Sequence, residues 1–208
     1  MNVYSFFIPL THKLEIMPVL KKSEIKRAAL VKATIHLVNN QGFHAAPMSK
    51  IAKMANVSPA TIYIYFENKQ DLVNQVYKEV KAEYMQYAFE TFNADASIAE
   101  GFELVWRRMA EYKLKDIEKG FFLSQCENTP MIDTSSRQDG IKNLKPLLDL
   151  WDRGITEGII KPLSHQLLYA FSIYPLAFLL NAEKRGDLKI TTAHLNEAYQ
   201  AAWASITQ

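Results

Sequence analysis

Cysteine, glycine and proline are scarce in this 208-residue chain. Its single cysteine, Cys126, excludes an intramolecular disulfide framework and a cluster of cysteine metal ligands. Seven glycines and eight prolines are too few for a collagen-like or low-complexity chain. Because 49% of the residues are hydrophobic and the net charge is only +2, the chain also lacks the composition of a disordered protein. We therefore expect a reduced, cytoplasmic protein with one or two compact domains.

Long hydrophobic runs are absent too. The longest apolar stretch, residues 167–180, includes Ser172 and Pro175 and is shorter than the roughly 20 residues of a membrane-spanning helix. The apolar segment 1–10 has no basic residues before it and no small-residue cleavage site after it, so it is a poor signal peptide. We expect no membrane association. Residues 1–20 are predicted to be an N-terminal extension, either disordered or not translated if synthesis begins at Met17.

Charge is distributed unevenly along the chain. Residues 21–80 hold nine Lys and Arg against four Asp and Glu, whereas residues 81–208 hold fourteen against seventeen. A basic N-terminal segment on a mildly acidic body indicates that one end of the molecule meets a polyanion. An ordinary solvated basic surface would give the same counts, so this interpretation needs support from the local pattern.

Apolar residues recur at helical spacing in the N-terminal part, and no strand-like alternation extends beyond a few residues. The first helix is expected to have Ser23 as its N-cap and to end at Gly42. A short second helix follows Pro47. The buried stripe of the first helix is predicted to consist of Leu30, Ala33, Leu37 and Val38.

A turn at residues 56–58 separates the second helix from a third at 59–65. Asn56 suits such a turn because Asn adopts a left-handed conformation at modest cost. Ser58 is expected to cap the third helix and Asn68 to cap a long fourth helix. The first three helices therefore form a small head, residues 21–67.

The rest of the chain, residues 68–208, also has the pattern of helices. We expect these helices to form a larger all-α body, so the fold class is all-α throughout. The expected breaks between helices lie at residues 93–95, Gly120, residues 128–130, Gly158, Pro162 and Gly186.

Two short helices joined by a three-residue turn predict a helix-turn-helix, whose second helix lies in the major groove of DNA. Small residues at the start of that helix let its backbone approach DNA, and tyrosine hydroxyls reach phosphates or base edges. An ammonium group in the first turn of the next helix favours a phosphate. Taken alone, these tyrosines would more often be packing residues and these lysines surface charges. The residues assigned to DNA binding are Ser49, Lys50, Ser58, Pro59, Ala60, Thr61, Tyr63, Tyr65 and Lys69.

The features that occur in order within this segment are Gly42-Phe43, Ile51-Ala52, Ala55, Val57-Ser58, Thr61, Tyr63, Tyr65-Phe66, Lys69 and Leu72. With these spacings, residues 25–72 resemble the DNA-binding head of the TetR-type transcriptional regulators. The segment departs from that pattern at Asn56, where the family usually has Gly. It also departs at Pro47-Met48, where the family commonly has Thr or Ser, and this weakens the assignment of contacts at residues 47–49.

The resemblance implies a homodimer whose two heads read a pseudo-palindromic, double-stranded DNA operator, with half-sites roughly 34–36 Å apart. It also implies that the body dimerises and holds a small-molecule pocket, and that ligand binding changes the separation of the heads. Most relatives are repressors, so a repressor released by its ligand is expected.

Two C-terminal segments are candidates for the dimer interface. Residues 163–182 are apolar over most of a helix circumference and must be covered on all sides, with Pro175 expected to kink or open the helix. Residues 192–206 carry an apolar stripe. Two such helices from each subunit would form a four-helix interface, which the family also uses; burial within one monomer is the alternative. The residues assigned to the interface are Leu167, Phe171, Phe178, Leu195, Tyr199 and Trp203.

Aromatic residues of the body can line a cavity for a lipophilic or aromatic ligand, although the same spacing is more often plain core. The residues assigned to the ligand are Trp106, Met109, Tyr112, Phe122, Gln125, Trp151 and Tyr174. Cys126 would act as a redox sensor only if it were exposed with a stabilised thiolate.

No catalytic motif is present. The chain has no glycine-rich phosphate loop, metal-binding His/Glu motif or nucleophile elbow, and its five histidines lack ligand spacing. We therefore expect no enzymatic activity, cofactor or metal. The alternative function left open is a dimeric DNA-binding protein with no inducer pocket, in a structural or nucleoid-associated role.

Overall fold

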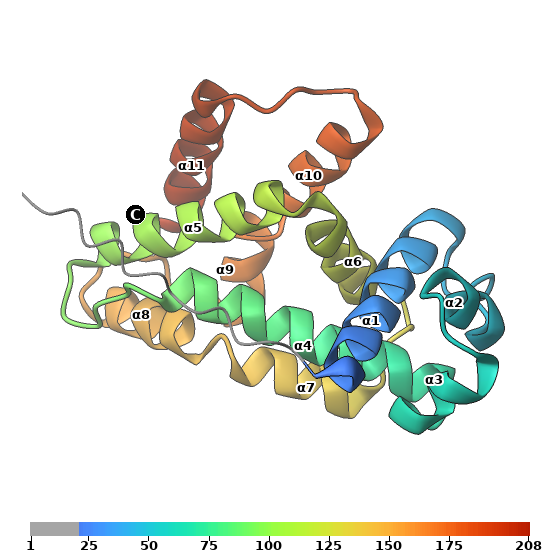
Figure 1. Cartoon of the computed structure of the whole chain (residues 1–208). Coiled ribbons are helices and arrows are strands. Elements are labelled where there is room, and N and C mark those ends of the chain that lie inside the picture. Colours follow the sequence, from blue (N-terminus) through green and yellow to red (C-terminus); the bar gives the residue numbers. More distant parts are fainter. Residues whose placement is uncertain (1–20) are drawn as a thin grey trace, which may run out of the picture.

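A computed structural model describes residues 21–208, apart from the side chain of Asn128. The predictions for residues 1–20 and for Met17 lie outside the described residues. Within them, helices and one isolated antiparallel bridge between Ile160 and Thr207 form the regular structure, and the all-α prediction is confirmed. The helices are α1 (Lys22–Gln41), α2 (Met48–Met54), α3 (Pro59–Tyr65), α4 (Lys69–Phe89), α5 (Ile98–Lys115), α6 (Ile117–Asn128), α7 (Thr134–Lys142), α8 (Lys145–Thr156), α9 (His165–Ser172), α10 (Pro175–Arg185) and α11 (Thr192–Ile206) (Figure 1).

Helices α1, α2 and α3 form the head at one end of the molecule (Figure 1). The N-cap of α1 is Lys21, so the prediction of Ser23 was wrong. The reason is that Glu24 accepts the backbone N–H of Lys21 at 2.7 Å and thereby closes the first turn two residues earlier. The predicted end at Gly42 is confirmed, with a φ of 79° that favours glycine. All four residues of the predicted stripe are buried.

The turn between α2 and α3 has the predicted conformation, because Asn56 has a φ of 55°. Ser58 caps α3 by accepting the Thr61 N–H at 3.2 Å, and Pro59 occupies the first helical position. Asn68 caps α4 by accepting the Asp71 N–H at 3.0 Å. These local bonds define where α3 and α4 begin.

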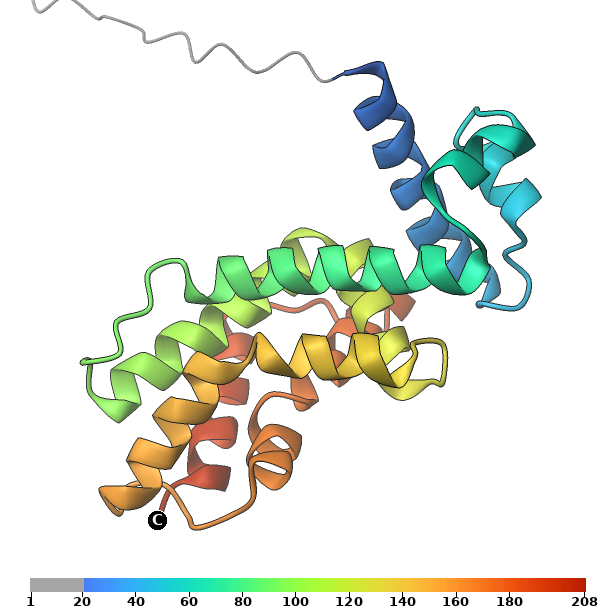
Figure 2. The same cartoon turned by 90° about the horizontal axis from the view of Figure 1, so that it is seen from below.

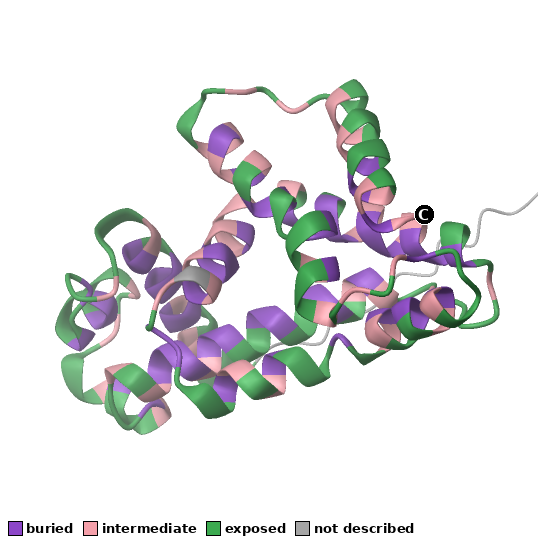
Figure 3. Cartoon of the chain, turned by 180° about the vertical axis from the view of Figure 1, so that it is seen from behind, coloured by how far each residue is buried: buried purple, intermediate pink, exposed green. Residues whose placement is uncertain are grey.

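Helix α4 connects the head to the body, as Figure 2 shows clearly. Its 21 residues correspond to about 31 Å of helix. In the body it packs against α5, α6 and α7. The largest fully buried side chains of the body include Trp106, Trp151, Phe102 and Phe122, and Figure 3 shows the buried faces turned towards one another.

The apolar segment 163–182 forms two helices, α9 and α10, with a break before Pro175. Proline has no backbone N–H to donate to the preceding turn. The helix was expected to kink or open at Pro175, and in the structure it is interrupted there completely. Helix α9 packs on α11, whereas α10 packs on α6, and α11 also contacts α5. Among the described residues, no helix is long and apolar enough to cross a bilayer.

Candidate DNA-binding surface and ligand cavity

Helix α3 presents a solvent-exposed face without charged residues. Tyr63 and Ile64 are 57% and 77% exposed, and Pro59 and Ala60 are also exposed. Thr61 and Tyr65 are half-buried. Ile62, on the opposite side of the helix, is fully buried in the head. This arrangement leaves the predicted reading face of α3 available to a large partner.

An open hollow lies between α2 and α3. It brings Ser49 of α2 next to Ser58 and Pro59 of α3, three of the residues predicted for DNA contact. Lys53 also lines this hollow, and the sequence assignment omitted it. The signal was present in the sequence: Lys53 follows Ser49 by four residues and therefore shares its helix face. The exposed Lys50 bonds to the side chain of Gln41.

Lys69 begins α4 at the edge of the head. Its Nζ donates to the carbonyl of His44 at 3.3 Å and lies 4.3 Å from the centre of the Phe43 ring. Partial burial lowers the pKa of Lys69. An ammonium group has three N–H donors, so two remain for a phosphate.

The body contains a cavity of about 380 Å³, a volume typical of small-molecule sites. Helices α4, α6, α7, α8 and α9 all contribute to its wall. The lining residues are Tyr77, Lys81, Glu127, Arg137, Gly140, Ile141, Leu144, Leu148, His165, Gln166, Tyr169 and Tyr174.

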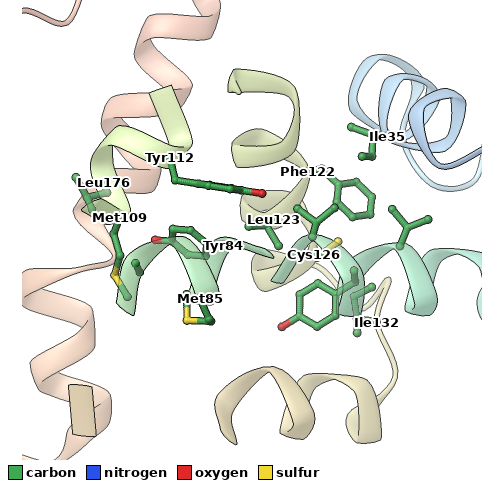
Figure 4. Close-up of a cluster of buried hydrophobic side chains, with 14 of the residues drawn as sticks. Ile35, Tyr84, Met85, Met109, Tyr112, Phe122, Leu123, Cys126, Ile132 and Leu176 are labelled. Carbon is green, nitrogen blue, oxygen red and sulfur yellow. The ribbon is translucent and has the colours of Figure 1, made fainter. Parts of the chain in front are cut away.

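Only Tyr174 among the seven residues assigned to the ligand lines this cavity. The others lie elsewhere in the body. Trp106, Met109, Tyr112, Phe122 and Trp151 are buried in the core, where Tyr112 packs against Tyr84 with ring centres 5.1 Å apart (Figure 4). Gln125 lines a separate surface hollow between α6, α10 and Asn39.

The polar part of the cavity is a buried ion pair. Lys81 Nζ lies 2.9 Å from Glu127 Oε1, and Lys81 is only 3% exposed. Although burial alone would lower it, the neighbouring Glu127 carboxylate raises the pKa of Lys81. Burial opposes ionisation of Glu127 as well, but Lys81 and Lys113 together hold its pKa below the ordinary value. Both groups are therefore charged at neutral pH.

The sequence contained a signal for these lysines that the assignment missed. Lys81 follows Tyr77 by four residues on the buried stripe of α4. Lys113 likewise follows Met109 by four on the buried stripe of α5. A lysine at a position where the helical period demands an apolar residue marks a buried charge.

Cys126 directly precedes Glu127 on α6 and is fully buried among hydrophobic side chains (Figure 4). Burial raises the pKa of its thiol far above the ordinary range, so the thiolate that a redox sensor needs is disfavoured. Across residues 21–208, no three His, Cys, Asp or Glu side chains are grouped so that they could hold a metal ion.

The residues assigned to the dimer interface differ in their exposure in the isolated protomer. Phe178 of α10 is 67% exposed, and Leu167 and Phe171 of α9 are also exposed. Tyr199 is buried within the protomer, and its ring packs on Phe102 and Trp106. Leu195 and Trp203 are half-buried.

Side chains tie the head to the body on two sides. On one side, Asn39 of α1 donates to the carbonyl of Glu118 at 2.8 Å, and Glu118 also pairs with Lys184 of α10. A second tie joins Arg27 of α1 to Glu79 of α4 at 2.6 Å. The head is therefore held by side-chain contacts to α4 and α6.

Two family models match the chain. One, described as bacterial regulatory proteins of the tetR family, covers residues 30–76. The other, described as a tetracyclin repressor-like C-terminal domain, covers residues 97–207. The two matches include both the helix-turn-helix and most of the body.

Known proteins are similar over most of the chain. A fatty acid metabolism regulator protein of Bacillus subtilis is 29% identical over 149 residues, which are 67% of this chain and 71% of that protein. The crystal structure of a TetR family transcription regulator from Marinobacter aquaeolei VT8 has a TM-score of 0.80 at 28% identity, over 88% of this chain and 96% of that chain. The Bacillus subtilis regulator FadR in complex with stearoyl-CoA has a TM-score of 0.68 at 23% identity, over 86% of this chain and 98% of that chain.

Proposed function

This chain belongs to the TetR family of bacterial regulatory proteins, and from that membership we propose a ligand-released repressor. In this proposal a homodimer binds a pseudo-palindromic operator through residues 21–67. Residues 68–208 dimerise and bind a small lipophilic or aromatic molecule, which releases the operator. The named relatives are transcriptional regulators rather than enzymes.

One observation carries this proposal: α4 belongs to both sites. Lys69, at its start, lies at the edge of the DNA-binding surface, and Tyr77 and Lys81 line the cavity. Twelve residues, or about 18 Å of helix, separate Lys69 from Lys81. A ligand that shifts α4 in the cavity therefore moves the base of the head, and a rigid helix transmits that displacement.

The exposed faces of α9 and α10 support the homodimer. Phe178, Phe171 and Leu167 present large apolar side chains to solvent in the isolated protomer. A neighbouring copy that covers them gains the burial free energy that the monomer lacks. We expect Phe178→Glu to shift the protein from dimer to monomer in sedimentation equilibrium. Ile159→Glu, at an exposed apolar residue outside these helices, is the control and leaves the dimer intact.

The cavity and the first relative support a lipophilic ligand. Tyr169, Tyr174 and three aliphatic residues give the cavity a largely apolar wall. The Bacillus subtilis relative is named for fatty acid metabolism. Both observations favour a molecule with a sizeable apolar portion.

The proposal is tested by selecting bound sequences from a randomised duplex library at about 150 mM salt, where non-specific phosphate binding is weak. We expect enrichment of an inverted repeat, and then release of that duplex when a compound that binds the cavity is added. Failure to enrich any sequence contradicts the proposal that the protein is a sequence-specific regulator. Enrichment without release by any cavity-binding compound favours the DNA-binding protein that has no inducer.

A further inference from the structure

Ile64 of α3 is the most exposed of the large hydrophobic side chains that the structure describes, at 77%. Within residues 21–208 it is neither part of the hydrophobic core nor packed against it. Ile62, two positions earlier, lies on the opposite side of the same helix and is fully buried. The two isoleucines therefore have different roles: Ile62 holds α3 on the head, whereas Ile64 is left for a partner.

Helix α3 lacks the side chains that most often distinguish bases by hydrogen bonding. Its sequence, PATIYIY, contains no Arg, Lys, Asn, Gln, Asp or Glu. In the major groove, Arg and Lys bond to guanine, and Asn and Gln bond to adenine, each through a pair of hydrogen bonds. The side chains of α3 therefore cannot make such a paired contact with a base.

The hydroxyl of Thr61 is already engaged within the head. Thr61 Oγ1 lies 2.7 Å from Ser58 Oγ, which also accepts the Thr61 N–H at 3.2 Å. These bonds form the N-terminal cap of α3, so diverting them to a base weakens the start of the helix. The polar groups of α3 that remain for DNA are the hydroxyls of Tyr63 and Tyr65.

The other exposed side chains near the centre of α3 are aliphatic. Ala60 lies one turn before Ile64 on the same side of the helix, and both residues are exposed. The small Ala60 lets the helix backbone come close to a base pair, and Ile64 then offers methyl groups to it. In the major groove the apolar group on the base edges is the 5-methyl of thymine. Contact between this methyl and Ile64 removes both from water, which is favourable.

The surrounding charge favours DNA as the occupant of this aliphatic surface. Residues 21–80 hold nine Lys and Arg against four Asp and Glu. Lys50 and Lys53 are exposed on α2, which packs against α3. An aliphatic surface beside basic residues complements the major groove, where thymine methyl groups lie between two phosphate backbones.

We infer that α3 reads its half-site through the 5-methyl group of thymine, and that Ile64 is the residue that determines this specificity. The inference rests on the DNA-binding function proposed above and specifies it: each half-site has a thymine at one fixed position, in contact with Ile64. Contacts of lysines with phosphates position the helix but carry no sequence preference. The contact at Ile64 supplies that preference.

The test uses the full-length protein and the inverted repeat that is selected from the randomised library. Each thymine is replaced in turn by deoxyuridine, which lacks only the 5-methyl group, at the symmetric positions of both half-sites. For one such pair we expect binding to weaken about fourfold for each methyl removed, and so about fifteenfold in all. Replacement of the other thymines leaves affinity nearly unchanged. Fluorescence anisotropy titrations measure these affinities.

Ile64→Ala is the matched variant. Because alanine has a higher helix propensity than isoleucine and the position is exposed, we expect α3 to remain folded. The variant should bind the unmodified operator about as weakly as the wild type binds the deoxyuridine operator, and it should be insensitive to deoxyuridine. Ile159→Ala, at an exposed isoleucine outside the head, is the control and retains the full sensitivity.

Several outcomes overturn the inference. An operator that binds equally well with deoxyuridine at every thymine shows that no methyl group is read. Sensitivity that survives in Ile64→Ala shows that another side chain contacts the methyl. A scrambled duplex with the same number of replacements controls for general effects of deoxyuridine, and a loss of equal size on that duplex also contradicts a specific contact.

Failure of this inference can be distinguished from failure of the proposed function. If no sequence is enriched, both the sequence-specific regulator and the thymine contact are contradicted. An inverted repeat that is insensitive to deoxyuridine contradicts the thymine contact alone. Methyl-dependent binding that no cavity-binding compound releases contradicts ligand release and leaves the assignment of Ile64 standing.

Discussion

The head and the body of this protein place their basic residues in opposite surroundings. In the head, Lys50 and Lys53 lie exposed at the helix-turn-helix, where a solvated ammonium attracts phosphate at little cost to stability. In the body, Lys81 and Lys113 are buried, where a charge is costly unless it is paired. The difference shows that positive charge in the head can act on a polyanion from the surface, whereas positive charge in the body must be satisfied inside the fold.

The largest loss of stability is expected at a side chain that belongs neither to the DNA-binding surface nor to the cavity. Trp106 is 1% exposed, and its indole N–H donates to the carbonyl of Ser172 at 2.9 Å. Trp106→Ala leaves a large void and an unpaired carbonyl, so we expect a loss of about 4 kcal/mol in the free energy of unfolding. Urea denaturation at fixed protein concentration measures this loss.

Tyr174→Ala is the companion variant for this prediction, because Tyr174 lines the cavity and is partly exposed. It should change ligand binding while the free energy of unfolding falls by much less. If Trp106→Ala were as stable as the wild type and altered ligand binding instead, the cavity would extend to the residues that the sequence suggested.

The second-largest loss of stability is expected at the buried ion pair of Lys81 and Glu127. Lys81→Met removes one partner and leaves the Glu127 carboxylate in a buried site, next to a lysine that does not bond to it. We expect a loss of about 3 kcal/mol in the free energy of unfolding. The double variant Lys81→Met/Glu127→Leu should recover most of this loss, since it removes the unpaired charge. A double variant no more stable than the single one would show that the pair is not the source of the effect.

A smaller effect of opposite sign is expected for the other lysine. Burial lowers the pKa of Lys113, and Lys113→Met removes a charge that has no ion-pair partner among the described residues. We expect the variant to be more stable by about 1–2 kcal/mol at pH 7.

The pH dependence gives this prediction a second test. In the unfolded chain a lysine has a pKa of about 10.4, above its lowered value in the native state. Over the interval between these values the unfolded state binds more protons, so the wild type gains stability as pH rises. The advantage of Lys113→Met should therefore shrink as the pH approaches 10, and an advantage independent of pH would contradict the assignment to a buried charge.

The sequence predicted the head in detail because its determinants are local. Asn56 and Ser58 adopt the predicted turn and cap through bonds that span three residues or fewer. The cavity is different: its wall draws on residues from Tyr77 to Tyr174, which only the packing of five helices brings together. Hydrophobic periodicity identifies the buried face of a helix, but it does not show whether that face packs against another helix or lines a cavity.

Gly120 is a single residue whose structural role could not be predicted from local sequence. It was expected to break a helix, yet α6 continues through it. A Cβ at this position would lie 2.9 Å from both the Lys113 carbonyl oxygen and Leu180, so the glycine permits close approach between α5, α6 and α10. The packing requirement was invisible in the sequence, where glycine favours a break.

The smallest expected effect lies on the exposed face of the head. Tyr63→Phe removes one hydroxyl from a side chain that is 57% exposed and leaves the fold of α3 unchanged. We expect operator affinity to fall about fivefold, corresponding to about 1 kcal/mol, if that hydroxyl bonds to a base or a phosphate of the operator. Anisotropy titrations with the selected operator and with a scrambled duplex separate the two cases. A loss of affinity confined to the operator indicates a base contact, whereas an equal loss on both duplexes indicates a phosphate contact. Lys69→Ala is the reference for a phosphate contact, since its affinity for DNA should depend less steeply on salt concentration. Unchanged affinity for both duplexes would remove the Tyr63 hydroxyl from the DNA-binding surface and leave recognition to the neighbouring apolar side chains.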